Sequence, residues 1–321
     1  MIKLKHLLSS EYLVLYLSVV YFLLLWPFTP GLASPQNMAN FFSNMLPLAV
    51  AAIGQTLVLV TAGIDLSATA IIALSSITGA YLMSSDSSLL PDSTLVVPIG
   101  IMAMLSVGAA LGFINGTAVS RLRMPPFMVT LAAMIFFSGF AVWMTQSGNI
   151  YNLPPAFNQI GQGSLLFIPF ALLIVLAVGI IAHVTLSKTV LGHRLYAVGH
   201  NLRAATVSGV PVNRTITLAY IGSGICAAVS SIIYTARLET GSPVLGEGVL
   251  LDIVAAAVIG GSSLFGGKGK VLWTVFGVLF ITLIDNSLNL LGLSYFAVLT
   301  VKGLIILLAA LLDAARLRWS Q

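Results

Sequence analysis

The chain has 321 residues, of which 58% are hydrophobic and only 7% are charged, and its mean hydropathy is +1.05. Soluble domains carry about 25% charged residues, so the composition excludes an ordinary water-soluble fold and predicts a protein whose solvent is the bilayer. The net charge of +5 does not indicate nucleic-acid binding, because the basic residues fall in short segments between apolar runs rather than along one face.

Apolar runs of about 20 residues, the length that crosses the hydrocarbon core, recur along the whole chain. The first run lacks a small-residue cleavage site after it, so we expect a retained span rather than a signal peptide. We predict an all-α polytopic membrane bundle that forms one domain over residues 1–321. Its ten predicted spans lie near 8–27, 41–62, 66–84, 94–119, 126–146, 165–186, 215–235, 249–266, 271–291 and 296–313.

The basic residues segregate into alternate loops, as the positive-inside rule requires. Only Arg237 falls in an outer loop and only Lys302 falls within a span, whereas acidic residues such as Asp86 and Glu247 lie outside. This pattern predicts cytoplasmic termini and a multi-pass protein of the cytoplasmic (inner) membrane. The predicted inner segments hold twelve of the fourteen basic residues, namely Lys3, Lys5, Arg121, Arg123, Lys188, Arg194, Arg203, Arg214, Lys268, Lys270, Arg316 and Arg318.

At two places in the chain the sequence leaves open whether the spans are continuous or form a broken or re-entrant helix. Only Gly63, Ile64 and Asp65 separate the second run from the third, and the eighth run, 249–266, is rich in glycine. Broken backbone is tolerated at membrane depth only where protein or a water-lined cavity satisfies it. A break at either place would therefore mark the interior pathway.

Residues 187–214, which we call the basic segment, form the longest predicted cytoplasmic loop. From residue 189 they read TVLGHRLYAVGHNLRAATVSGVPVNR. Leu191 to Arg203 contains good helix formers, and Gly209 and Pro211 are suited to end a short helix. The basic side chains suit an acidic or polar partner. The alternative is a solvated loop that merely obeys the positive-inside rule.

The basic segment resembles the cytoplasmic coupling loop of the ribose-type monosaccharide ABC importer permeases. Three further stretches agree with that family in the same order: AGIDLS (62–67), GFINGTAVSRLRMPPFMVTLAAM (112–134) and GEGVLLDIVAAAVIGGSSLFGGKG (246–269). The chain departs from the family at Ala62 and Thr69, where glycine is usual and backbone freedom is greater.

The resemblance implies that the basic segment docks on a separate ATP-binding ABC subunit and passes its closure to the spans. It also implies two other partners, a second permease copy or paralogue and an extracytoplasmic sugar-binding protein, in addition to the surrounding membrane lipid. By this resemblance the contacts that couple to the ATPase are made by Gly192, Arg194, Tyr196, Ala197, Gly199, Asn201, Arg203, Ala204, Ala205 and Gly209.

The glycine–lysine cluster GGSSLFGGKGK (260–270) fails the Walker A spacing, because Gly267 rather than lysine follows the second glycine of the pattern. We therefore expect a non-catalytic transport subunit that binds no cofactor itself, with ATP and Mg on the partner ATPase. A polytopic membrane enzyme is a rival interpretation, but the sequence has no HExxH zinc motif and no evident Cys–His constellation.

Polar residues inside apolar runs are candidates for the substrate pathway, because they are costly at membrane depth. Asp65 is suited either to cap the third span or to line the pathway. Asp252 lies at the predicted outer start of the eighth span, where it either meets sugar hydroxyls or a receptor arginine, or is simply solvated. Neutral groups contact sugar hydroxyls or bond neighbouring helices. The candidates are Gln55, Asp65, Ser67, Asn115, Asp252 and Asn286.

Two helix contacts are also predicted. Asp285 and Lys302 fall at equal depth if the last two spans form an antiparallel hairpin, so we expect a buried ion pair; the alternative is that Lys302 reaches outward alone. Gly108, Gly112 and Gly116 recur every four residues and predict a flat face for close helix packing.

The rival transport mechanism is a secondary transporter driven by an ion gradient, which requires a carboxylate at mid-membrane. Asp65 and Asp285 are the candidates for that carboxylate. The sequence leaves open which sugar is carried, and whether the permease pairs with itself or with a paralogue.

Overall fold

The computed structural model describes residues 12–86 and 94–319, so Lys3, Lys5, Asp92 and the predicted start of the first span lie outside the described residues. The described chain is mostly helical, with one hairpin of two short antiparallel strands, β1 (Ser164–Leu165) and β2 (Ile168–Pro169). The helices are α2 (Leu13–Leu25), the 3-10 turn η1 (Trp26–Phe28), α3 (Pro35–Leu59), α4 (Ala68–Met83), α5 (Val96–Ser120), α6 (Pro126–Thr145), α7 (Pro155–Gln162), α8 (Phe170–Lys188), α9 (Val190–His200), α10 (Leu202–Val207), α11 (Val212–Leu238), α12 (Leu250–Gly260), α13 (Val271–Leu290) and α14 (Tyr295–Trp319).

Each of the ten predicted apolar runs contains one of these helices. In the described part of the chain, six helices are long and apolar enough to cross a membrane: α3, α5, α6, α8, α11 and α13. The other four runs contain shorter apolar stretches, Leu13–Phe28, Ala68–Met83, Leu250–Gly260 and Tyr295–Ile305. The helices are thus where the hydropathy pattern put them, while ten complete crossings stay a prediction.

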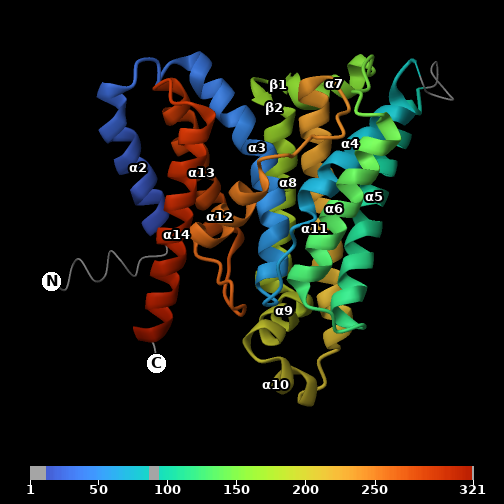
Figure 1. Cartoon of the computed structure of the whole chain (residues 1–321), viewed down its shortest axis with the longest axis vertical. Helices are drawn as coiled ribbons and strands as arrows, with labels where there is room; N and C mark the ends of the chain where they lie inside the picture. The colour runs from blue at the N-terminus through green and yellow to red at the C-terminus, as the bar shows by residue number, and fades with distance from the viewer. Residues whose placement is uncertain (1–11, 87–93, 320–321) are drawn as a thin grey trace.

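The two ends of the bundle differ in character (Figure 1). Helices α9 and α10 lie at one end, together with the α5–α6 junction and the loop between α12 and α13, whereas α7 and the β1–β2 hairpin lie at the opposite end. The end with α9 and α10 therefore collects basic residues from three separate loops, among them Arg123, Arg203 and Lys268.

Helix α5 packs against α11 along the glycine face that the sequence predicts. A Cβ atom added to Gly108 would lie 2.3 Å from the carbonyl oxygen of Gly224, and one added to Gly112 would lie 2.3 Å from that of Tyr220. At Gly116 the nearest atom would be the Cα of Thr217, at 2.8 Å. Only glycine allows the two backbones to approach so closely, so the predicted helix-packing role is confirmed.

The chain is broken between α3 and α4. Residues 60–67, which we call the linker segment, follow the end of α3, and Ala62 has a left-handed φ of 61°. Replacement of glycine by alanine at this position therefore strains the break but does not remove it. The capping interpretation placed Asp65 at the start of α4, and this is wrong. The N-cap residue of α4 is Ser67, two positions later.

The eighth predicted span is not continuous. Helix α12 has 11 residues and is about 16 Å long at 1.5 Å per residue, about half of the 30 Å hydrocarbon core. It ends at Gly261, whose φ is +118°, and residues 261–270 form an irregular segment, the glycine loop, in which Gly266 and Gly267 also have positive φ. Of the two alternatives for 249–266, the structure shows the broken helix, because apolar composition continues past the point where the backbone leaves the helix.

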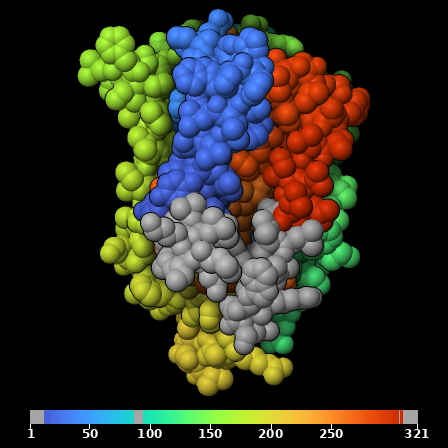
Figure 2. All heavy atoms as spheres, turned by 90° about the vertical axis from the view of Figure 1, so that its left-hand side faces the viewer, coloured from blue at the N-terminus to red at the C-terminus, as the bar shows by residue number. Residues whose placement is uncertain are grey.

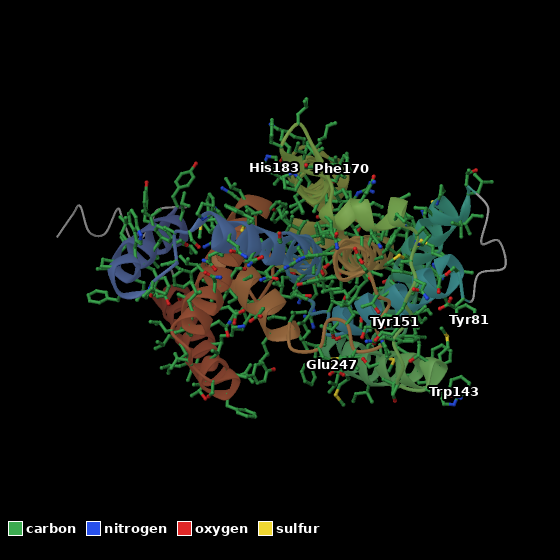
Figure 3. All side chains as sticks on the ribbon, turned by 90° about the horizontal axis from the view of Figure 1, so that it is seen from above. Tyr81, Trp143, Tyr151, Phe170, His183 and Glu247 are labelled. Carbon is green, nitrogen blue, oxygen red and sulfur yellow. The ribbon has the colours of Figure 1, made fainter. Side chains whose placement is uncertain are left out.

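The segment between the predicted spans 126–146 and 165–186 contains the short helix α7, and the next long helix begins at Phe170 rather than at 165. Seen from above, Phe170 and His183 mark α8 on one side of the molecule, and Trp143 marks α6 on the opposite side (Figure 3). Figure 2 shows α2 next to the C-terminal helices on another face. Helix α6 exposes Phe136 and Trp143, as expected of a helix in contact with lipid.

Candidate functional site

The basic segment folds into two short helices rather than the single one expected. Thr189 caps α9, since its Oγ1 accepts a hydrogen bond of 3.2 Å from the amide of Gly192. Asn201 caps α10 in the same way, accepting from the amide of Ala204 at 2.9 Å. An extended Asn201 separates the two helices, because a residue whose side chain caps the second helix leaves the helical conformation of the first. Gly209 follows α10 with a φ of +77°.

The outward side of the basic segment combines charge with exposed apolar side chains. Arg194 and Arg203 are exposed, and the neighbouring Leu202 and Val207 are 52% and 90% exposed. Behind α10 lies a groove of about 990 Å³, lined by α9, α10, the start of α11 and the α5–α6 junction. Of the predicted coupling residues, Asn201, Ala204 and Gly209 are also exposed, Ala197 is half-buried, and Gly192 and Ala205 are buried.

Two predicted coupling residues face the rest of the chain instead. The hydroxyl of Tyr196 donates a hydrogen bond of 2.6 Å to the carbonyl oxygen of Gly269. Burial raises the pKa of the Tyr196 phenol above its ordinary value, so the phenol remains a protonated donor at neutral pH. Gly199 packs closely on the backbone of Val60. A Cβ added to Gly199 would lie 1.8 Å from the carbonyl oxygen of Val60.

The linker segment is held by a buried polar cluster centred on Asp65. One carboxylate oxygen accepts hydrogen bonds from the amide and the hydroxyl of Ser67, at 3.0 and 2.6 Å, and the other accepts from the hydroxyl of Ser223 at 2.8 Å. The side-chain amide of Asn115 donates to the Ser67 hydroxyl at 2.7 Å. Three of the predicted pathway residues are thus brought together by hydrogen bonds, namely Asp65 and Ser67 of the linker segment and Asn115 of α5.

Helix α11 contributes partners to this cluster that no sequence pattern indicates. Ser223 bonds Asp65, and the hydroxyl of Tyr220 donates to the carbonyl oxygen of Ile64 at 3.2 Å. These residues lie 158 and 156 positions along the chain from their partners, so no local spacing indicates the contact. The signal available was a pair of hydroxyl residues on the helix that faces the α5 glycines.

Gln55 is the predicted pathway residue with the least satisfied side chain. It is fully buried in α3, and neither its amide nitrogen nor its amide oxygen has a hydrogen-bond partner among the described residues. An unpaired buried amide costs about 1–3 kcal/mol per group. Such a group is suited to take a partner that arrives from outside the folded chain.

A buried ion network joins the three C-terminal helices. The Lys302 ammonium lies 2.8 Å from Asp285, which confirms the predicted pair, and 3.0 Å from Asp252, which sequence reasoning had placed at a solvated or substrate-facing helix start. Asp252 is instead buried in the first turn of α12. Lys302 therefore tethers the short helix α12 to α13 and α14.

The side chain of Asp285 keeps 41% of its surface exposed. An ionised carboxylate at membrane depth is too costly to face hydrocarbon, so this face of α13 meets water or protein. The adjacent Asn286, the last of the predicted pathway residues, exchanges two hydrogen bonds of 2.9 Å with Asn37 of α3. In this conformation Asn286 bonds a neighbouring helix, which is the alternative to contact with a sugar hydroxyl.

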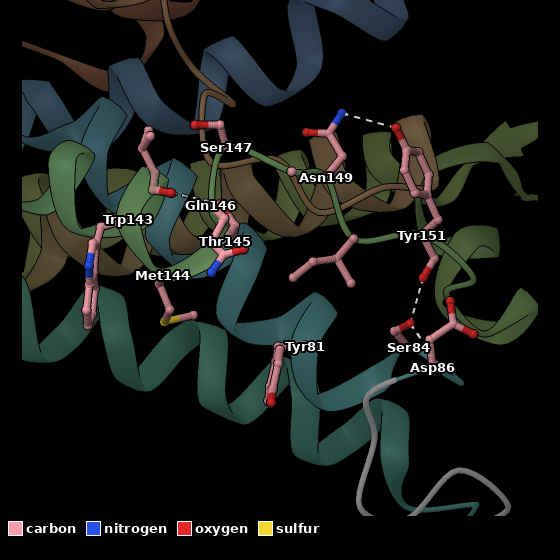
Figure 4. Close-up of a pocket in the computed structure, with 13 residues that line it drawn as sticks. Tyr81, Ser84, Asp86, Trp143, Met144, Thr145, Gln146, Ser147, Asn149 and Tyr151 are labelled. Atoms are coloured by element: carbon pink, nitrogen blue, oxygen red, sulfur yellow. Dashed lines mark hydrogen bonds between the residues drawn. The ribbon is translucent and has the colours of Figure 1, made fainter.

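The end opposite α9 and α10 carries a hollow of about 930 Å³ beside the ends of α4 and α6 (Figure 4). The aromatic side chains of Tyr81, Trp143 and Tyr151 line it together with Asp86. Ser84 fixes one wall, since its hydroxyl donates to the carbonyl oxygen of Tyr151 at 2.7 Å. Aromatic faces beside carboxylate and amide groups form a surface suited to a polar protein partner.

The bundle consists of apolar helices, is interrupted at the linker segment and at the glycine loop, and carries the basic segment at one end. These features define a multi-pass membrane transport protein. The profile of the family described as "Branched-chain amino acid transport system / permease component" matches residues 37–310. The chain belongs to this permease family, whose members are transport subunits of the inner membrane that work with an ATPase and a substrate-binding protein.

Several relatives are similar over nearly their full length. The ribose import permease protein RbsC of Bacillus subtilis (strain 168) is 38% identical over 88% of this chain and 86% of its own. The protein of the same name from Escherichia coli (strain K12) is 34% identical over 89% and 88%. The D-allose transport system permease protein AlsC of Escherichia coli (strain K12) is 34% identical over 86% and 83%. No solved structure matches the chain. These similarities do not favour the ion-gradient alternative.

Proposed function

We propose that this chain is the membrane-spanning permease subunit of an ATP-driven ABC importer for a monosaccharide, ribose or a related sugar. The similar permeases are named for ribose and D-allose, and a further one, 31% identical over 95% of this chain, is named for L-arabinose. The observation that carries the proposal is the capped, two-helix basic segment, which presents arginines and apolar side chains outward at one end of the bundle.

The orientation follows from charge. Three separate basic loops meet at the end with α9 and α10, so this end faces the cytoplasm, with both termini on the same side and ten crossings in all. Arg194 and Arg203 then form charge-assisted hydrogen bonds with the ATP-binding subunit, while Leu202 and Val207 bury apolar surface against it. The hollow beside Tyr81 and Trp143 faces outward and receives the extracytoplasmic sugar-binding protein.

The translocation pathway runs beside α12. This short helix and its irregular flanks cannot be exposed to lipid without leaving backbone groups unsatisfied, and Asp285 on the adjoining helix requires water or protein. A second permease copy or paralogue covers this face, and the pathway runs between the two. Gln55 and Asn286 contact sugar hydroxyls as the dimer changes state, with Asp252 adjoining them; Asp65, Ser67 and Asn115 position the linker segment.

Energy comes from outside this chain. The glycine loop has no Walker A spacing, so ATP and Mg are bound by the partner subunit, and this chain is a non-catalytic transport subunit. ATP-driven closure of two partner subunits shifts the permease dimer between outward-facing and inward-facing states. Because the binding protein selects the sugar, the permease needs few strong contacts along the pathway.

Reconstitution into proteoliposomes tests the proposal. With the partner ATPase, the binding protein and ATP-Mg, labelled ribose or a related sugar should accumulate, and omission of either partner should abolish uptake. Arg194→Glu and Arg203→Glu should weaken docking of the ATPase, whereas Arg121→Glu, an exposed charge reversal at the same end, serves as the matched control. Uptake that follows an imposed ion gradient without the ATPase would contradict the proposal.

A further inference from the structure

The glycine loop, which failed as a nucleotide-binding motif, is the element that the basic segment contacts inside the chain. Tyr196 of α9 donates its 2.6 Å hydrogen bond to the loop at Gly269. At the end of α9, His200 lies against Gly267, where an added Cβ would be 2.6 Å from the His200 Nδ1 atom and 3.2 Å from its Cα. Side chain and backbone therefore both connect α9 to the loop.

The linker segment meets the loop at the same point. The amide of Gly267 donates a hydrogen bond of 2.9 Å to the carbonyl oxygen of Val60, the same oxygen on which Gly199 packs. The neighbouring Gly266 also meets the linker segment, since a Cβ added to it would lie 2.6 Å from the Cβ of Ala62. Three segments that are distant in sequence thus meet backbone to backbone at one junction, which consists of the end of α9, the linker segment and the glycine loop.

The glycine loop is closed on itself and fixed at both ends. The amide of Ser263 donates to the carbonyl oxygen of Lys268 at 2.9 Å, and that of Ser262 donates to Ala257 of α12 at 2.9 Å. At the end of α12, Gly260 packs on Trp273 of α13, where an added Cβ would lie 2.2 Å from the Trp273 carbonyl oxygen. Because these contacts restrain the loop, we expect a displacement of the loop to be passed to the end of α12 rather than absorbed by a flexible connection.

We propose that the glycine loop is the receiver of the ATPase stroke: α9 moves it as one body through Tyr196 and Gly199, and the loop moves the short helix α12. Tyr196, Gly199 and Gly267 are thus positioning residues, which face inward and transmit motion, whereas α10 faces the ATPase. The inference rests on the proposed function. It adds the route by which motion leaves the basic segment and reaches the half-length helix beside the pathway.

The first test measures sugar imported per ATP hydrolysed in proteoliposomes that contain the complete transporter. Tyr196→Phe keeps the ring and removes one hydrogen bond, and should lower this ratio by about fivefold, the factor expected for one hydrogen bond. Gly199→Ala should lower it further while the ATPase still binds. The matched controls are Tyr16→Phe on the exposed side of α2, and Gly139→Ala, where an added Cβ meets nothing within 4 Å.

A covalent link separates transmission from a merely structural role. In a Cys226→Ala background, which removes the only cysteine of the chain, His200→Cys and Gly267→Cys place two thiols across the junction. The Cβ at residue 267 would lie 3.2 Å from the Cα of residue 200, and a disulfide forms between Cβ atoms about 3.5–4.5 Å apart. With Tyr196→Phe present, oxidation should restore the ratio of sugar to ATP, and reduction should lower it again; a lost packing contact elsewhere would not respond to the redox state.

Either of two results would overturn the receiver role: an unchanged ratio in both Tyr196→Phe and Gly199→Ala, or uptake abolished by the disulfide, which would show that α9 separates from the loop during the cycle. If the double-cysteine protein fails to fold, the ratio in Tyr196→Phe decides alone. Failure of the proposed function is distinct, since the unmodified transporter would then show no ATP-driven uptake at all, and disulfide formation in membranes would still report whether the junction exists.

Discussion

The two interruptions of the helical bundle are held in different ways. The linker segment between α3 and α4 is fixed by short hydrogen bonds to Asp65 from Ser67 and Ser223, all of them buried within the bundle. Helix α12 is attached through the Lys302 ion network near its start and through the glycine loop at its end. The first interruption is held by side-chain hydrogen bonds to a buried carboxylate, whereas the second is held by ion pairs near its start, by the glycine loop at its end and by close packing of Ala256 on Gly277 of α13 between them.

From this difference we expect the linker segment to stay fixed and helix α12 to move. Hydrogen bonds that come from three helices leave the linker segment no direction in which to move without breaking several of them. A short helix of about 16 Å that packs closely on a neighbour is displaced as one rigid element. The junction at the end of α9 therefore joins the hydrogen-bonded backbone at Val60 to the glycine loop at Gly267, through which we expect α12 to be displaced.

The tether of α12 gives the largest expected effect. Lys302→Met should lower the free energy of unfolding in detergent by about 4 kcal/mol, because Asp252 then remains buried without a counter-charge. Lys268→Met, the same substitution at an exposed lysine, is the control and should change stability little. Asp252→Asn added to Lys302→Met should recover part of the loss; no recovery would show that the charges do not interact.

The lock on the linker segment comes next. Asp65→Ala removes the acceptor of three hydrogen bonds, from the Ser67 amide and the hydroxyls of Ser67 and Ser223. We expect a loss of about 3 kcal/mol in unfolding free energy, measured by denaturant titration, with the exposed Asp86→Ala as its control. Equal stability of the two variants would refute the description of this interruption as the fixed one.

The seam between α5 and α11 tests the frame in which both interruptions sit. Gly112→Ala should destabilise by about 2 kcal/mol, since the added methyl group meets backbone that cannot turn away. Gly139→Ala should instead be neutral or raise stability by about 0.5–1 kcal/mol, because alanine favours an open helical site. The difference between the two thermal unfolding curves measures the packing term directly.

Strain at Ala62 gives the smallest effect and the opposite sign. Ala62→Gly should raise the free energy of unfolding by about 1 kcal/mol, because glycine adopts a φ of 61° without a steric penalty. Ala73→Gly, in the regular and buried part of α4, should lower it by a similar amount. If Ala62→Gly destabilises the protein, the left-handed conformation at this residue is not a source of strain.

Sequence patterns located the helices because hydropathy and glycine spacing report directly on burial and close approach. Gly108, Gly112 and Gly116 predicted the α5 face correctly. The same signals failed at α12, where Ser262 to Phe265 are apolar or small enough to extend the hydrophobic run although the backbone has already turned at Gly261. Apolar composition indicates that a segment is surrounded by lipid or protein. It does not indicate the residue at which the helical hydrogen bonds end.

The candidate site was predicted in part for a similar reason. The family pattern identified the basic segment, and equal depth identified Asp285 with Lys302. The sequence did not reveal that Asp252 completes the network from 50 residues away, or that Tyr196 and Gly199 face inward, since both depend on where α12 and the glycine loop lie. Long-range contacts of an interrupted helix leave no period in the sequence.

The separate caps at Thr189 and Asn201 give the two helices of the basic segment independent starting points. Helix α10 consequently carries Leu202, Arg203 and Val207 of the proposed ATPase surface, whereas the contacts with the glycine loop are all made by α9. Exchange of residues 202–207 between related permeases should therefore re-address one transporter to the ATPase of another without disturbing how its own interior responds.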